Sequence, residues 1–187
     1  MNVIEAIKTR RAVRAFTPRV VEEASVRALL TAAVQAPSAT NAQPWAFAVI
    51  QNTDQLKRYS ERGKRILLEQ FEGDPKAQRY RALLGDESFN IFYDASTLVA
   101  IGVTSRTIYS DADCWLAAQN LMLAATDAGL GTCCLGFAVP VLNAPDVKAE
   151  LGFGSAGAVI APVIVGYPST SLAPVSRQEP RVVYWSR

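Results

Sequence analysis

Residues 36–45 read Ala-Pro-Ser-Ala-Thr-Asn-Ala-Gln-Pro-Trp and lie between a helix-type pattern and a strand-type run. Proline fixes φ and lacks a backbone N–H, so Pro37 should end the helix and Pro44 should keep the approach to the strand extended. Trp45 is expected to anchor the start of that strand in the core. The polar side chains between the two prolines can recognise a planar polar ligand: Ser38, Thr40, Asn41 and Gln43. An ordinary helix-to-strand loop would show the same residues. The stretch therefore predicts a helix-loop-strand unit and a candidate binding loop.

A second polar stretch, residues 10–16, reads Arg-Arg-Ala-Val-Arg-Ala-Phe and lies about one helix upstream. Arginine dominates it, and guanidinium groups bind phosphate in a bidentate manner. A solvated basic turn would also fit the pattern, because charged runs usually face water. Arg10, Arg11 and Arg14 are therefore candidate ligands for a phosphate or another anion.

The composition fits one globular domain with a substantial core. The chain has 187 residues, of which 50% are hydrophobic and 19% charged. Its net charge of +2 gives no electrostatic argument for binding nucleic acid. The N-terminus is too short and too charged for a signal peptide, and no apolar run approaches the ~18 residues that a membrane helix needs. We expect a cytoplasmic protein that binds neither nucleic acid nor membrane.

Cysteine and histidine usage excludes several classes of site. Cys114, Cys133 and Cys134 show no C-x-x-C spacing, so neither a disulfide framework nor a structural zinc site is expected. The adjacent pair is most simply two small core residues. The chain has no histidine, which removes the commonest general base and metal ligand together. A Ser-His-Asp hydrolase is excluded, and no metal site is expected.

Hydrophobic periodicity predicts helices and short strands in alternation. The expected helices cover residues 2–9, 22–36, 53–71, 110–128 and part of 140–152, and the expected strands cover residues 45–50, 97–103, 132–137 and 158–168. The first helix should bury Val3, Ile4 and Ile7, whereas the helix at 110–128 is apolar on more than one face and should be buried on all sides or form a subunit interface. Pro162 favours an edge strand or a bulge. The pattern predicts an α+β or α/β layered fold, but periodicity alone cannot order the strands.

The two polar stretches together resemble the nitroreductase-type flavoprotein family, whose signature is an R-R/H-S-x-R/K run followed by P-S-x-x-N-x-Q-P-W. Residues 37–45 match the second motif at every position. Ala12 differs from the first motif, because the family usually has serine at this position. One hydroxyl contact to the flavin phosphate should therefore be missing. Residues 129–136 resemble the family run G-L-G-x-x-x-x-G, whose last glycine lies at the reactive edge of the flavin. The resemblance covers nearly the whole chain and is loosest at residues 52–95.

The resemblance implies a single domain over residues 1–187, with a mixed central β-sheet flanked by helices. It also implies an intertwined homodimer that holds FMN at the subunit interface. Residues 72–93 fall in the family's variable segment, so they are a candidate lid over the substrate side of the flavin. A plain helical excursion that packs its aromatic side chains inward fits this segment equally well.

The resemblance also assigns roles to individual residues, with the chemistry itself carried out at flavin N5 and no side chain assigned as catalytic. Arg10, Arg11 and Arg177 would hold the FMN phosphate, with Ala12 at the missing serine. Arg14 would lie near the pyrimidine edge and stabilise the anionic reduced flavin, and Lys64 would join it. Pro37, Ser38 and Ala39 would pack on the flavin from the partner subunit, Asn41 would hydrogen-bond the ring system, and the backbone at Leu135 and Gly136 would meet N5.

The implied function is an FMN-dependent oxidoreductase that reduces nitroaromatics, quinones or similar electron-poor compounds. NADH or NADPH would be the reductant, in a ping-pong hydride mechanism. Three alternatives stay open at this point. One is a sister activity of the same fold, such as reductive dehalogenation, flavin destruction or dehydrogenation. The others are a flavin-binding sensor or carrier without enzymatic activity, and a small anion-binding module that uses the arginine cluster.

Overall fold

The computed structural model describes residues 1–171, 173 and 175–187. The helices are α1 (Val3–Thr9), α2 (Glu23–Ala33), α3 (Thr53–Gln70), α4 (Gln78–Gly85), α5 (Ser110–Asp127), α6 (Val139–Leu142) and α7 (Pro145–Glu150). The strands are β1 (Trp45–Ile50), β2 (Thr97–Val103), β3 (Gly131–Cys134) and β4 (Ala158–Gly166). Three short 3-10 turns complete the described elements: η1 (Ala39–Asn41), η2 (Pro75–Ala77) and η3 (Gly136–Ala138).

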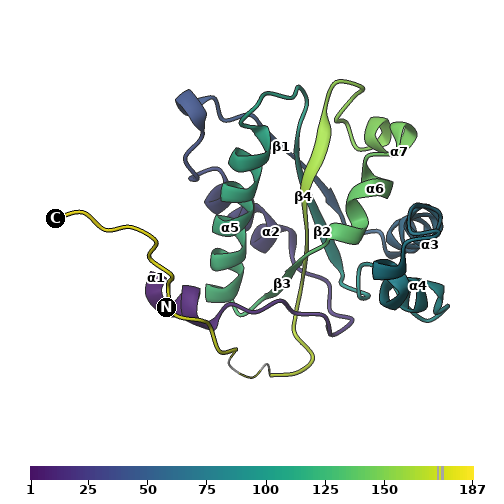
Figure 1. The fold of residues 1–187 in the computed structure, drawn as a ribbon, viewed down its shortest axis with the longest axis horizontal. Helices are drawn as coiled ribbons and strands as arrows, with labels where there is room; N and C mark the ends of the chain where they lie inside the picture. Colours follow the sequence, from purple (N-terminus) through teal and green to yellow (C-terminus); the bar gives the residue numbers. More distant parts are fainter. Residues whose placement is uncertain (172, 174) are drawn as a thin grey trace.

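The sheet has the strand order β1-β2-β4-β3, and each of its three pairs is antiparallel. The expectation of a mixed sheet therefore needs a correction. Parallel pairing is limited, among the described residues, to an isolated bridge between Ala12 and Thr132 beside β3. The α+β class is confirmed, because helices cover both faces of one central sheet (Figure 1).

Side-chain alternation along the strands creates one hydrophobic core on each face of the sheet. In β2, Val99 and Ile101 pack into the core under α2 and α5. Leu98 and Ala100 point the other way, into the core under α3, α6 and α7. Figure 1 shows the same division, with α2 and α5 on one side of the sheet and α3, α4, α6 and α7 on the other. This period of two is what a strand buried on both faces requires.

The helix α1 is less buried than the sequence pattern predicts, and α5 is buried on its sheet side but not on all sides. The helix α1 buries Ala6 alone, and the prediction that Val3, Ile4 and Ile7 are buried is wrong for the single chain, because all three are exposed. The helix α5 packs small residues against the sheet, yet Trp115 is 43% exposed. Both helices therefore leave apolar surface facing away from the core.

Pro162 lies in the central strand β4 and not at an edge, the first of the two positions predicted for it. The second, a bulge, lies close by, because the register between β2 and β4 shifts between Ile101 and Gly102. Its carbonyl accepts a hydrogen bond from the Leu135 backbone N–H at 3.0 Å. Pairing between β3 and β4 stops at Cys134 and Val163, so Pro162 faces the place where β3 has ended. A missing backbone N–H at this position removes no strand-to-strand hydrogen bond from the ladder.

The chain after β4 leaves the body of the molecule as an extended tail, which Figure 1 shows running outward past α1. Its described residues carry apolar side chains that are exposed: Val175, Val182, Val183, Tyr184 and Trp185. Within the described residues, no helix combines the length and the apolar character needed to cross a membrane.

Candidate functional site

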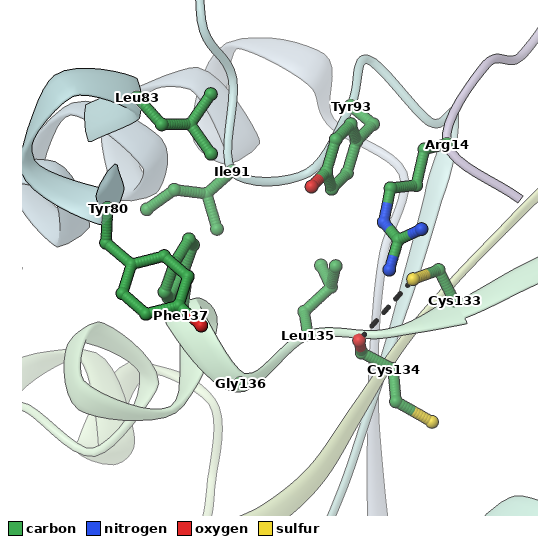
Figure 2. A pocket seen from close by; sticks show the side chains of 10 residues that line it. All are labelled: Arg14, Tyr80, Leu83, Ile91, Tyr93, Cys133, Cys134, Leu135, Gly136 and Phe137. Carbon is green, nitrogen blue, oxygen red and sulfur yellow. Dashed lines mark hydrogen bonds between the residues drawn. The ribbon is translucent and has the colours of Figure 1, made fainter. Parts of the chain in front are cut away.

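A cavity of about 360 Å³ opens between the segment after α1, the end of β3, the helix α4 and the loop before β2 (Figure 2). This volume lies at the lower end of the range for small-molecule sites. The lining residues are Arg14, Tyr80, Leu83, Ile91, Tyr93, Cys133, Cys134, Leu135, Gly136 and Phe137. Three of the predicted cofactor residues are therefore brought together here: Arg14, Leu135 and Gly136.

Backbone contacts between the segment after α1 and β3 place Arg14 in the cavity. The Val13 N–H donates to the Thr132 carbonyl at 2.9 Å, which fixes the segment beside the strand. A Cβ at Gly131 would lie 2.7 Å from the Val13 side chain, so glycine is required where the two backbones meet. Among the described residues, Arg14 forms no ion pair, and its guanidinium carbon lies 5.9 Å from the centre of the Tyr93 ring. The cavity thus contains an uncompensated positive charge.

Leu135 and Gly136 form the wall of the cavity where the chain turns from β3 into η3 (Figure 2). The Leu135 N–H bonds to β4, which leaves its side chain buried and its position fixed. A Cβ at Gly136 would meet no other atom within 4 Å. Glycine at this position is therefore not demanded by the packing of the protein, and it leaves open space next to the backbone.

The opposite end of the cavity is aromatic and apolar. The rings of Tyr80 and Phe137 meet edge to face with centroids 5.5 Å apart, and Leu83 and Ile91 lie beside them (Figure 2). Tyr80 and Leu83 come from α4, so the candidate lid supplies part of the wall. That residues 72–93 move as a lid stays a prediction. The cavity has one cationic end and one aromatic end.

Both adjacent cysteines lie at the cavity, although the sequence favoured plain core positions. Burial raises the pKa of the Cys133 thiol. The pKa of Cys134 is raised to about 11, mainly by burial and to a smaller extent by the neighbouring Cys133 thiol. The charge of Arg10 opposes both shifts, and Arg14 opposes the shift at Cys133, so both arginines act on this region. The thiols stay protonated at neutral pH, which argues against a nucleophilic role.

The other predicted basic residues lie elsewhere. The Arg11 guanidinium donates to the backbone carbonyls of Lys8, Arg10 and Ala173, so it holds the end of α1 and the start of the tail. Arg177 lies exposed on the outgoing tail. Neither residue lines the cavity.

Lys64 is buried on α3, where its ammonium donates to the Asp86 carbonyl at 3.0 Å and pairs with Glu61 at 3.2 Å. It is absent from the cavity wall. Lys64 thus ties α3 to the end of α4, and its place gives no support to the prediction that it contacts the flavin.

The loop after α2 is rigid but does not line this cavity. Thr40 and Asn41 have φ values of 53° and 55°, and the Ser38 hydroxyl accepts a hydrogen bond from the Gln43 N–H at 2.9 Å. The Ala39 N–H donates to the buried Asp113 carboxylate in the first turn of α5 at 3.0 Å. Asp113 was not singled out from the sequence, because a contact between the loop and a distant helix leaves no local sequence signal. Pro37 and Asn41 are exposed, and neither lines the cavity of its own chain.

Sequence comparison identifies the family. The model of the nitroreductase family matches residues 7–167. The chain belongs to the nitroreductase family. A Methanothermobacter thermautotrophicus protein named "Putative NADH dehydrogenase/NAD(P)H nitroreductase" is 33% identical over 133 residues, which cover 70% of this chain and 59% of that protein. A Thermotoga neapolitana protein named "Iodotyrosine deiodinase" is 29% identical over 132 residues, covering 67% of this chain and 68% of that protein.

Structural comparison agrees with this membership. A crystal structure described as a nitroreductase with bound FMN from Bacteroides fragilis superposes with a TM-score of 0.85. It is 27% identical in sequence, and the match covers 100% of both chains. The nitroreductase fold predicted from the two N-terminal motifs is thereby confirmed.

Proposed function

We propose that this nitroreductase-family chain binds FMN and reduces nitroaromatic, quinone or similar electron-poor compounds with NADH or NADPH in a ping-pong reaction. The observation that carries the proposal is the cavity at the end of β3, which combines a free arginine with open space beside Gly136. The FMN-bound Bacteroides fragilis relative supports the choice of cofactor, and the name of the archaeal relative supports the choice of reductant.

The lining residues fit the two ends of an isoalloxazine ring. The pyrimidine end of this ring carries carbonyl oxygens, which match the guanidinium donor of Arg14. The dimethylbenzene end is apolar and matches the aromatic pair of Tyr80 and Phe137. The absence of a Cβ at Gly136 lets a flat ring approach the backbone. The donor set of the cavity is therefore compatible with a flavin.

When bound, FMN would supply the redox chemistry by taking two electrons from NAD(P)H and passing them to the acceptor. The chain would bind and orient it. Arg14 would place a fixed positive charge where negative charge accumulates, without gaining or losing a proton. The cavity wall contains no carboxylate. Protons for the reduced product would therefore come from water.

The remaining predicted contacts require a second copy of the chain. Arg10, half-buried next to the cavity, would hold the phosphate in the same subunit. The cavity of their own chain is not lined by Pro37, Ser38, Ala39 or Asn41, which would instead reach the FMN of the partner. Arg177 would follow with the exposed tail. We therefore propose a homodimer with FMN at the subunit interface. The exposed apolar side chains on α1, α5 and the tail support this assembly.

Reductive dehalogenation is the second candidate, because one relative is named as an iodotyrosine deiodinase. An amino-acid substrate carries an ammonium group, and the cavity wall of the single chain offers no carboxylate to pair with it. This favours uncharged aromatic acceptors. Flavin destruction, dehydrogenation and a carrier role without turnover remain open as outcomes of the test.

The test is a screen of NADH and NADPH oxidation by the FMN-reconstituted protein against a nitroarene, a quinone and 3-iodotyrosine. Nitroarene or quinone turnover well above the rate with oxygen alone is the expected result. Turnover confined to 3-iodotyrosine with iodide release would replace the proposal with the second candidate. No turnover with any acceptor would favour the carrier.

A further inference from the structure

Tyr93 supplies a polar group to the cavity that the proposed function leaves without a role. Its ring lines the cavity, and Figure 2 shows its hydroxyl pointing into the open space. Among the described residues, no side chain or backbone group forms a hydrogen bond with this hydroxyl. A phenol O–H usually finds a partner when it is partly buried. An unpaired one inside a cavity is therefore available to a ligand.

The loop that carries Tyr93 holds it in a conformation that is unfavourable for residues with a Cβ. Tyr93 and Asp94 both have φ values of 52°. The Asn90 side chain maintains this shape, because its amide donates to the Asp94 carboxylate at 2.7 Å and its oxygen accepts from the Phe92 N–H at 2.8 Å. The buried Ser60 hydroxyl fixes the same loop by accepting from the Ile91 N–H at 3.0 Å. Backbone strain of this kind often accompanies a side chain that is positioned for function.

Two further contacts fix the direction of the Tyr93 ring. Phe89 packs edge to face against it with centroids 5.6 Å apart. The Arg14 guanidinium carbon lies 5.9 Å from the ring centre on the cavity side. The ring therefore packs against an aromatic side chain and has a cation near it. Tyr93 and Arg14 are neighbours in the cavity wall, and Figure 2 shows the Tyr93 hydroxyl on the side of the ring that faces the open space.

We propose that Tyr93 is a cofactor-tuning residue, whose hydroxyl donates a hydrogen bond to a carbonyl oxygen at the pyrimidine edge of FMN beside Arg14. The inference rests on the proposed function, because it requires FMN in this cavity. Reduction increases the negative charge on those oxygens, and a hydrogen bond to a more negative acceptor is stronger. Tyr93 therefore binds the reduced cofactor more tightly than the oxidised one and raises the reduction potential of the bound FMN.

The test compares the reduction potential of bound FMN in the wild type and in Tyr93→Phe, which keeps the ring and removes the hydroxyl. The potential is read from visible spectra during equilibration with a reference dye. We expect the preference for reduced FMN to fall about tenfold, which corresponds to about 30 mV for a two-electron couple. Tyr109→Phe is the matched control, because it also removes one phenol hydroxyl, but Tyr109 lies just before α5 and does not line the cavity. This control should keep the wild-type potential.

The outcomes separate the role of Tyr93 from the proposed function. A Tyr93→Phe protein that binds FMN at the wild-type potential would overturn the role of Tyr93 and leave the proposed function standing. An unchanged potential with a raised KM for the acceptor would also overturn it, because the hydroxyl would then contact the substrate. A wild-type protein that binds no FMN would overturn both.

Discussion

Arg14 is the residue whose charge matters most to the proposed chemistry, because it lies in the cavity with no carboxylate paired to it. We predict that Arg14→Ala slows turnover about tenfold to a hundredfold. FMN affinity should fall by only about threefold, since an exposed ionic contact contributes little binding. Stopped-flow reduction and fluorescence titration with FMN measure the two effects separately.

Arg19→Ala is the matched control for Arg14, because Arg19 stacks on the Tyr167 ring at 4.0 Å and does not line the cavity. It should leave both quantities unchanged. Wild-type turnover in the Arg14 variant would refute the electrostatic role.

Gly136 tests whether the open space beside the backbone is used by a ligand. A methyl group at this position meets no protein atom within 4 Å, so Gly136→Ala should change the free energy of unfolding by less than about 0.5 kcal/mol. FMN affinity should fall about tenfold or more, because the new Cβ occupies the approach to the backbone. Thermal unfolding of the apoprotein and FMN titration provide the measurements. Gly85→Ala on α4, where a Cβ also has open space, should change neither.

At the residue scale, sequence reasoning found the groups that belong to recognisable motifs. The arginine run and the glycine run predicted Arg14 and Gly136 as cofactor ligands. The structure places both in one cavity, and their contact with a cofactor stays a prediction. Tyr80 and Tyr93 were noticed only as aromatic residues, because residues 72–93 lack a clean period that would show which way each ring points. Lys64 looked like a free cation, and its burial beneath the end of α4 depends on tertiary packing that no local pattern records.

Glu22 links two elements that are distant in sequence, the start of α2 and the end of β4. Its carboxylate accepts a hydrogen bond from the Tyr167 hydroxyl at 2.6 Å and pairs with Arg19 at 2.6 Å. The hydrogen bond from Tyr167 is the larger cause and the one from Arg19 the next, and they lower the pKa of Glu22 to about 2 from the ordinary 4.5. A lowered pKa stabilises the fold fully above about pH 4.5, and this stabilisation is lost as the pH falls through about 2.

We therefore predict that the Tm of Glu22→Gln falls less steeply than that of the wild type between about pH 4.5 and pH 2. Protonation of Asp146 contributes to the remaining fall, because its pKa is also about 2 as a result of its hydrogen bonds with Arg62. Calorimetry over this pH range makes the comparison. The neighbouring Glu23→Gln, which loses only a contact with Arg27 one turn away, should keep the wild-type profile. Identical profiles for wild type and Glu22→Gln would show that the link does not stabilise the fold.

At the element scale, short continuous apolar runs located the strands, and apolar stripes located the main helices. Strand order and direction could not be predicted, because pairing depends on contacts between distant segments. Pro162 in the central strand β4 is an example. The sheet accommodates a proline there because β3 ends opposite it, and this does not depend on the residues next to Pro162 in the sequence. The burial of α1 was overestimated because, among the described residues, nothing covers Val3, Ile4 and Ile7.

The whole molecule exposes apolar side chains that a second copy of the chain would cover. Leu116 on α5 is 44% exposed, and Trp185 in the tail is 74% exposed. We predict that Leu116→Arg converts the dimer to a monomer, since it places an unpaired charge in the interface, and that FMN affinity falls with it. Light scattering coupled to size exclusion measures the assembly.

Arg65→Glu, a charge change on the exposed side of α3, should preserve the dimer. A wild-type protein that is monomeric and saturates with FMN would contradict the interface site.

At the scale of the molecule, the predicted homodimer came from family resemblance rather than from physical reasoning on the residues. The apolar helix α5 did indicate either a domain centre or an interface. The structure shows that α5 packs small residues such as Ala117 and Ala118 in the core and leaves Trp115 43% exposed in the single chain; its place in an interface stays a prediction.

The most direct test of the central claim is the visible spectrum of the FMN-reconstituted protein, recorded without air before and after NADH or NADPH is added. The account predicts a flavin spectrum that bleaches with the nucleotide and returns when a nitroarene or a quinone is added. A protein that retains no flavin, or a bound flavin that neither nucleotide bleaches, would contradict it.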